Sequence, residues 1–207
     1  IRKAMYFARN AKAIVDYKGG PTYNGGYVQS VVSPLNTVDY APNGEWGPGN
    51  PNWKPEGNVE YAQKLMDEAK TACPADYKKA TTDGVVIDVR QSATLTDTVP
   101  INQAAWARVG IKVSYNPIAA GYYPTVMNPA KQSDLSTSGW SQDWPNASTV
   151  IPPLYTPEGG FDISQNTDDP IYKQFSDDVN TAIGNSNRKS QAAQWKALEK
   201  TAAKQFW

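Results

Sequence analysis

Histidine is absent from this sequence of 207 residues, and cysteine occurs only once, as Cys73. Without histidine the chain has no Ser-His-Asp or Cys-His catalytic set, no histidine-ligated zinc and no usual general base near neutral pH. The single cysteine cannot form an internal disulfide, so cysteine usage does not indicate a compartment. These absences disfavour an enzyme, and we expect neither a cofactor nor a bound metal.

An excess of charge of one sign is also absent, because lysine plus arginine and aspartate plus glutamate both total 20. The chain therefore has no net field that would hold nucleic acid or an anionic membrane surface, and we expect no nucleic-acid partner. No apolar run approaches the roughly 20 residues of a membrane span, and no signal peptide opens the sequence. Glycine pairs occur without the spacing of a phosphate-binding loop.

The chain starts at Ile1 instead of methionine, and Ile1, Ala4, Met5 and Ala8 already recur at helical spacing. This pattern is typical of a helix cut from a running chain. We therefore expect a fragment or engineered domain of a longer protein, with any targeting signal, lipid anchor or partner domain outside it. The length and the 40% hydrophobic content favour a single compact unit.

Hydrophobic periodicity and turn residues predict an α/β fold in which a small mixed sheet is flanked by helices. Residues 85–90, 111–115 and 134–138 have strand-like patterns, and the helix between the first two is expected to start near Thr98 because Pro100 follows. Repeated Gly, Pro and Asn predict an extended loop region over 19–57. The expected helices are 1–17, 58–71 with Asn58 as N-cap, 98–108, 120–127, 169–184 and 187–205.

A run of alternating polar residues, Asp162, Ser164, Asn166 and Asp168, looks like the start of a calcium-binding loop. Its sixth position is Thr167 instead of glycine and its twelfth is Lys173 instead of glutamate, so we expect the run to cap the helix that begins near Asp169. Adjacent acidic pairs at 168–169 and 177–178 point in different directions on a helix and are expected to be solvated.

Residues 139–146 have the sequence Gly-Trp-Ser-Gln-Asp-Trp-Pro-Asn, and this turn after the third expected strand is the best candidate for a binding site. The chain holds 7 Trp and 12 Tyr against 4 Phe, which favours binding surfaces weakly and a tyrosine-rich core equally well. In a purely structural interpretation, Trp140 packs in a core and Asp143 caps the segment after Pro145. A buried aspartate needs a partner, and a ligand is one candidate.

Several segments together resemble the second lobe of the family 5 extracellular solute-binding proteins, which include the oligopeptide- and dipeptide-binding proteins of ABC importers. Residues 1–10 are similar to the family's "vRkAlnyAid" helix, although Ala11 stands where an arginine or lysine is usual. Residues 60–69 resemble its "ekAkkLLaeAG" helix, residues 106–113 its "L..iGIkV" helix-to-strand step, and residues 139–145 its cleft-lining "GW..DyPdP" segment. The resemblance spans nearly the whole chain and implies one solute-binding lobe over 1–207, of the periplasmic-binding-protein type II kind.

The resemblance implies that Asp143 receives the free α-amino group of a peptide. Trp140 and Trp144 would then form apolar or cation-stacking walls, with Asn146 as a polar contact. Ser138, at the end of the third expected strand, completes the predicted ligand-binding set. Trp144 replaces a more usual tyrosine and Asn146 a more usual aspartate, which leaves the identity of the ligand open.

The implied function is that of the substrate-binding component of an ABC importer, which captures a peptide or other small solute between two lobes and is not an enzyme. The expected partners are the solute, an N-terminal lobe of the same chain and the permease subunits. We expect a monomer that is extracellular or periplasmic and anchored, as a lipoprotein, by a segment outside this sequence.

Two alternatives of other classes stay open. A carboxylate-based carbohydrate-active enzyme needs two carboxyl groups about 5–10 Å apart, and the sequence gives Asp143 no evident partner. A surface interaction module predicts that Trp140 and Asp143 are buried or scattered, and not gathered on one face.

Overall fold

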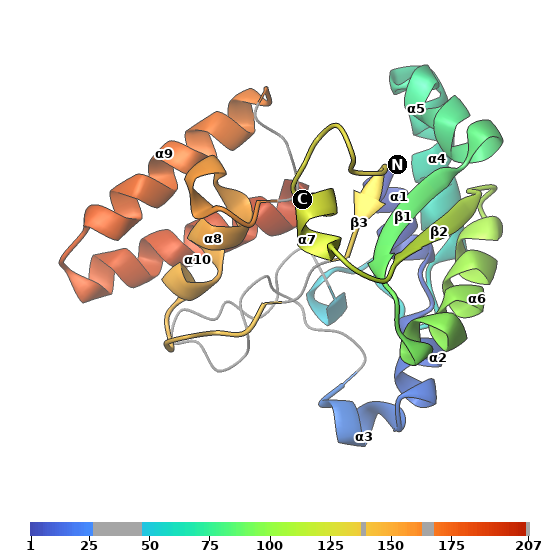
Figure 1. Cartoon of the computed structure of the whole chain (residues 1–207), viewed down its shortest axis with the longest axis horizontal. Helices are drawn as coiled ribbons and strands as arrows, with labels where there is room; N and C mark the ends of the chain where they lie inside the picture. Colours follow the sequence, from blue (N-terminus) through green and yellow to red (C-terminus); the bar gives the residue numbers. More distant parts are fainter. Residues whose placement is uncertain (27–46, 138–139, 163–167, 206–207) are drawn as a thin grey trace. The chain divides into compact units, whose positions relative to one another are not determined.

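The fold is described from a computed structural model that covers residues 1–26, 47–137, 140–162 and 168–205 (Figure 1). The chain divides into two units. Unit 1 comprises Ile1–Val28 and Pro51–Thr137, and unit 2 comprises Gln29–Asn50 and Ser138–Trp207. The expectation that residues 1–207 form a single lobe stays a prediction.

Unit 1 opens with two short helices, α1 (Arg2–Ala8) and α2 (Ala11–Tyr17), where one continuous helix over 1–17 was expected. That prediction is wrong because Asn10 starts a new helix. Its Oδ1 accepts a hydrogen bond from the backbone N–H of Ala13 at 2.9 Å, which is an N-cap. Asparagine competes well with helix continuation at such positions. A third short helix, α3 (Gly20–Asn24), then lies inside the region predicted as loop.

The described end of that loop region is tied to the first helices. The described part of this region begins with the 3₁₀ turn η1 (Gly47–Gly49). Further along it, the carbonyl of Glu56 accepts a hydrogen bond from Arg108 Nη2 at 3.1 Å, and the same nitrogen donates to the carbonyl of Ala8 at 2.7 Å. Gly57 has a φ of +88°, and a Cβ there would lie 2.5 Å from the carbonyl oxygen of Ala8. The chain can pass this close only because residue 57 is glycine.

The helix expected over 58–71 is confirmed as α4 (Val59–Ala72). Asn58 caps it as predicted, because its Oδ1 accepts from the backbone N–H of Tyr61 at 3.1 Å. The apolar stripe packs inward, with Ala62 and Met66 fully buried. Pro74 begins a separate helix, α5 (Pro74–Lys78), which continues into the π-helical turn η2 (Lys79–Asp83). Neither of these two elements was expected.

A three-stranded sheet forms the centre of unit 1, with β1 (Val85–Arg90) between β2 (Val113–Ile118) and β3 (Leu135–Ser136). β1 lies where it was predicted, β2 starts and ends later than predicted, and β3 is shorter. Both pairings are parallel, so the described strands form a parallel sheet and not the mixed one expected. The helical crossovers α6 (Ala93–Ala107) and α7 (Tyr122–Val126) explain this, since parallel neighbours need such connections.

Helix α6 (Ala93–Ala107) starts before the expected Thr98 and contains Pro100 in its interior. The prediction of its start is therefore wrong. A proline removes one helical hydrogen bond, and contacts of α6 with its neighbours stabilise the helix on both sides of Pro100. Gln103 Nε2 donates to the carbonyl of Val113 at 2.8 Å. The indole Nε1 of Trp106 donates to the carbonyl of Met5 at 2.8 Å. These bonds tie α6 to β2 on one side and to α1 on the other (Figure 1).

Asp88, in the middle of β1, is fully buried and fully hydrogen-bonded. Its carboxylate accepts from the Ser133 N–H at 2.7 Å, the Ser133 hydroxyl at 2.8 Å and Asn116 Nδ2 at 2.8 Å. Burial by itself would raise the pKa of this carboxyl, but the bonds from Ser133 and Asn116 outweigh burial and lower it. Asp88 therefore stays charged and joins the central strand to both flanking segments.

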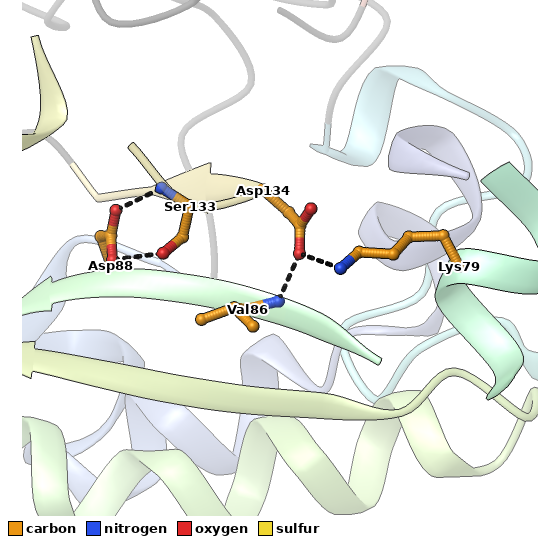
Figure 2. A network of polar contacts seen from close by, with 5 residues as sticks. All are labelled: Lys79, Val86, Asp88, Ser133 and Asp134. Atoms are coloured by element: carbon orange, nitrogen blue, oxygen red, sulfur yellow. Dashed lines mark hydrogen bonds and ion pairs between the residues drawn. The ribbon is translucent and has the colours of Figure 1, made fainter. Parts of the chain in front are cut away.

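Figure 2 shows how a second carboxylate continues this network where β3 has not yet begun. Asp134 accepts from the backbone N–H of Val86 at 2.8 Å and pairs with Lys79 Nζ at 3.2 Å. The side chain thus takes the place of a missing strand partner. The predicted helix 120–127 is confirmed as α7 (Tyr122–Val126), whose Tyr122 hydroxyl donates to the Thr137 carbonyl.

Unit 2 is helical in its described part. The helices predicted over 169–184 and 187–205 are confirmed as α9 (Pro170–Gly184) and α10 (Arg188–Gln205). Asp169 caps α9, as expected, by accepting from the Ile171 N–H at 2.8 Å. Short helices precede them, namely η3 (Ala147–Thr149), α8 (Ile151–Tyr155) and η4 (Pro157–Gly159). The buried core consists of Ala147, Ile151, Phe175, Val179, Ala182, Trp195, Leu198 and Ala202; Phe206, expected on the α10 stripe, lies outside the described residues.

None of the helices in the described residues is both long enough and apolar enough to cross a membrane.

Candidate functional site

The candidate turn is organised by Thr149, a fully buried residue that sequence analysis did not single out. Its carbonyl accepts from the indole Nε1 of Trp140 at 2.7 Å, and its Oγ1 accepts from the backbone N–H of Asp143 at 2.8 Å. Two positions of the turn are therefore fixed to one buried residue. A threonine three residues after an asparagine is too common a pattern to have predicted this.

Asp143 is exposed, and its carboxylate makes no hydrogen bond or ion pair with the described part of the chain. The purely structural interpretation assigned it the cap of the following segment. That assignment is wrong, because Asn146 is the cap of η3 and accepts from the Ser148 N–H at 2.9 Å. The backbone of Asp143 is held while its charged group is free for a ligand.

The two tryptophans of the turn lie differently. Trp144 is 50% exposed, and its indole Nε1 donates to the hydroxyl of Ser148 at 2.9 Å. Trp140 is half-buried and packs against Phe161, with ring centroids 5.0 Å apart. Hydrogen bonds at both indole nitrogens fix the orientation of the rings. Trp144 therefore leaves part of an apolar, electron-rich ring exposed in the same turn as Asp143.

Asn146 is 6% exposed and belongs to the interior of the turn. Its N–H donates to the Trp144 carbonyl at 2.9 Å, whereas its Nδ2 is buried without a hydrogen-bond partner. The nearby Oε1 of Gln142 is also buried and unpaired. The predicted contact between Asn146 and a ligand stays a prediction. Ser138, the fifth predicted site residue, lies outside the described residues.

A second group, in unit 1, was not predicted. Arg90 ends β1, is exposed and has its guanidinium carbon 5.5 Å from the ring centre of Tyr122 and 5.2 Å from that of Tyr123. Within the described residues it forms no ion pair. The two rings are themselves in edge-to-face contact, with centroids 5.6 Å apart, so the guanidinium lies against the pair. A cation stacked on aromatic rings keeps its hydrogen-bond donors available for an anion. The signal that could have found it is a basic residue at the carboxyl end of a strand in a βαβ unit, where α/β proteins bind ligands.

No cluster of three or more potential metal ligands occurs among the described residues. Of the run that resembles a calcium loop, Asp162 accepts a hydrogen bond from the hydroxyl of Tyr172, while Ser164 and Asn166 lie outside the described residues. In unit 2, the pKa of the Tyr155 hydroxyl is strongly shifted. Burial, and then the charges of Glu199 and Asp162, raise its pKa to about 12, so its hydroxyl stays protonated near neutral pH.

Comparison with known proteins assigns the chain to a family. A family model described as the middle part of bacterial extracellular solute-binding proteins, family 5, matches residues 1–162. The chain belongs to this family. The proteins of this family bind solutes outside the cytoplasm, as the family description states. No curated protein matches the chain.

Solved structures of family 5 type share the fold along almost the entire chain. A clavulanic acid biosynthesis oligopeptide-binding protein has a TM-score of 0.74 and 18% identity, over 99% of this chain and 36% of that one. The oligopeptide-binding protein AppA of Bacillus subtilis gives 0.68 and 18%, over 98% and 39%. The protein DppA of Helicobacter pylori gives 0.66 and 21%, over 98% and 36%.

These similarities confirm the α/β fold of the periplasmic-binding-protein type II kind. The chain spans less than two-fifths of the length of each of these three solved structures. A family 5 protein of their length therefore contains a large part that has no counterpart in this chain.

Proposed function

We propose that this chain is one lobe of the substrate-binding component of an ABC importer, and that its solute is a peptide. The observation that supports this most directly is the Asp143 carboxylate, which is exposed, has no partner among the described residues, and lies on a turn fixed by Thr149. A carboxylate held in this way is suited to accept charge-assisted hydrogen bonds from an ammonium group. The free α-amino end of a peptide is such a group.

Trp144 strengthens the choice of a cationic group. Its ring is half exposed, and its indole N–H is already used by Ser148. The free face can therefore contribute a cation–π contact beside the carboxylate, worth about 0.5–2 kcal/mol. A sugar would also stack on this ring, but it has no ammonium to satisfy Asp143. The combination favours a peptide over a carbohydrate.

Arg90 is a separate candidate, in unit 1, for contact with an anionic group. Its guanidinium lies against the rings of Tyr122 and Tyr123 and has no acidic partner in the described residues. Arginine binds a carboxylate through two parallel hydrogen bonds. Arg90 is therefore suited to bind a carboxylate group of a ligand.

The solved structures support the same ligand class. The H. pylori protein was solved with the peptide STSA and the B. subtilis protein with a nonapeptide. We propose by this similarity that the complete protein is a monomer, works outside the cytoplasm with a second lobe and permease subunits, and is anchored to the membrane. Binding and release by lobe closure need no chemical step, so the protein would not be an enzyme.

The test is native mass spectrometry of the complete protein that contains this chain, purified gently from its cells, together with the variants Asp143→Asn and Asp76→Asn. Asp143→Asn keeps the shape of the side chain and removes its charge. Asp76 is exposed on α5 in unit 1 and serves as the control. We expect bound masses that fragment as short peptides in the wild type and the control, and at least a tenfold loss of them in Asp143→Asn.

Other outcomes would count against the proposal. A non-peptide solute, or hydrolysed sugars released from an added oligosaccharide, would replace it with another solute class or with the carbohydrate-active enzyme. Peptides retained at full occupancy by Asp143→Asn would show that the α-amino group is held elsewhere.

A further inference from the structure

Helix α10 carries a one-sided array of positive charge. Four of its lysines are exposed and are spaced by seven, four and four residues. At about 100° per residue, this spacing places all four within an arc of about 80° around the helix axis, on one face. They extend along about 22 Å of the helix axis. The lysines are Lys189, Lys196, Lys200 and Lys204, called the lysine stripe below.

No acidic side chain of the described residues pairs with the lysine stripe. The acidic residue of α10, Glu199, is 1% exposed and lies in the interior. In the described residues, none of the four lysines takes part in an ion pair, and Asp177 and Asp178 of the packed helix α9 form none with them. The chain as a whole has no net charge, so this face is a local concentration of positive potential that composition conceals.

The opposite face of α10 is already occupied. Trp195, Leu198 and Ala202 are buried in the core of unit 2, where α10 packs beside α9 (Figure 1). Between the lysines, the stripe exposes only the small side chain of Ala193. The helix therefore has no free apolar side chains to insert into a bilayer, and a partner of the lysine stripe must be recognised by charge.

We propose that the lysine stripe docks on the anionic phospholipid surface of a membrane. A straight row of flexible, fully hydrated ammonium groups suits a broad and mobile layer of phosphate headgroups. Single acidic ligands are better bound by a converging pocket of planar guanidinium groups. This interaction is separate from solute binding, because the lysine stripe contains none of the residues assigned to the peptide.

The expected association is weak and reversible. A lysine near an anionic surface contributes about fivefold to partitioning, so the four together contribute on the order of several hundredfold. The effect is screened within about 10 Å at 0.1 M salt. A protein that delivers its solute to a membrane protein would thus be concentrated and oriented at the bilayer without being held there.

The experiment measures binding of the full chain to vesicles of phosphatidylglycerol and phosphatidylcholine by co-sedimentation, at 20 to about 500 mM salt. The test variant replaces the four lysines of the stripe with glutamine, which keeps helix propensity. The control variant makes the same change in net charge at four exposed lysines of unit 1, namely Lys18, Lys64, Lys70 and Lys131. Circular dichroism confirms that both variants are folded.

We expect the wild type and the control to bind vesicles at low salt and to dissociate at high salt, with binding of the test variant reduced by roughly several hundredfold. Equal losses in both variants would show that only net charge matters and would overturn the proposal. So would the absence of wild-type binding, binding that salt does not reduce, or equal binding to vesicles of phosphatidylcholine alone. Peptide capture by the test variant remains at the wild-type level in either case, which separates this result from a failure of the proposed function.

Discussion

Asp88 illustrates at the scale of one residue how a charge is kept inside this fold. The residue has no exposed surface, yet its carboxylate accepts three hydrogen bonds from Ser133 and Asn116. Burying a charge costs several kcal/mol unless donors replace water, and here they do. The position was predicted as part of a strand, but nothing in the local pattern indicated that the strand's aspartate would be interior.

We expect Asp88→Asn to lower the free energy of unfolding at pH 7 by about 2–3 kcal/mol, because the new amide group faces donors and cannot accept from all of them. The pKa of Asp88 is lowered in the folded state, so its stabilising effect is present above the unfolded pKa of about 3.9 and is lost as pH falls through the folded pKa. Urea unfolding of the wild type and the variant at pH 7, 4 and 2.5 measures the difference.

The difference between the two proteins should shrink toward acid pH. The exposed Asp76→Asn change serves as the control and should alter neither stability nor its pH dependence by more than about 0.5 kcal/mol. A destabilisation by Asp88→Asn that is the same at every pH would mean that the ionised carboxylate is not what stabilises the fold.

The candidate turn shows what could be predicted at this scale. The sequence singled out Trp140, Asp143, Trp144 and Asn146, and the structure places all four in one turn. Which of them faces solvent was not predictable, because it depends on bonds to Thr149 and Ser148. Asn146 takes the capping role that the structural interpretation had given to Asp143, and this exchange leaves the charged group exposed.

At the scale of elements, local signals succeeded where they agreed with one another. Helix α4 has an apolar stripe, an N-cap and a terminating proline, and its bounds fall within one residue of the prediction. Continuity was harder to predict. The N-cap at Asn10 divides the first predicted helix into two helices. Helix α6 continues through Pro100 because packing stabilises it. In both cases local interactions outweighed the prediction from average residue preferences.

We expect Asn58→Ala to cost about 1 kcal/mol of stability, because it removes the acceptor for the Tyr61 N–H at the start of α4. Asn58 Nδ2 also donates to the Asn52 carbonyl at 2.9 Å. Asn58→Asp keeps the cap and loses this second bond, and it should therefore retain more of the stability than alanine does. Thermal and urea unfolding compare the three proteins, and an alanine variant as stable as the aspartate variant would show that the cap is not stabilising.

At the scale of the whole molecule, the question is whether the two units act as one lobe. The family model matches residues 1–162 and so crosses the end of unit 1 at Thr137. Solved structures match both units together, over 98–99% of the chain. Contacts nevertheless divide the chain in two, so the single lobe over residues 1–207 stays a prediction that unfolding can test.

A single lobe should unfold in one transition. Trp106 and Trp195 are buried reporters of unit 1 and unit 2, respectively. We expect their ¹⁹F signals, in protein labelled with fluorotryptophan and assigned through Trp→Phe variants, to disappear at the same urea concentration. Two separated midpoints would show two independently stable domains.

The sequence by itself determined the fold class, the family and the position of the candidate turn. These follow from local order: the period of apolar residues, the caps and breakers between elements, and motifs whose spacing the chain preserves. Tertiary structure alone decided which groups are exposed and which are neutralised. It made the sheet parallel, buried Asp88 among donors, placed Arg90 against two tyrosine rings, and turned the lysine face of α10 away from the core of unit 2. Burial and electrostatic potential depend on which neighbours surround a group in space, and that information is not contained in any single segment.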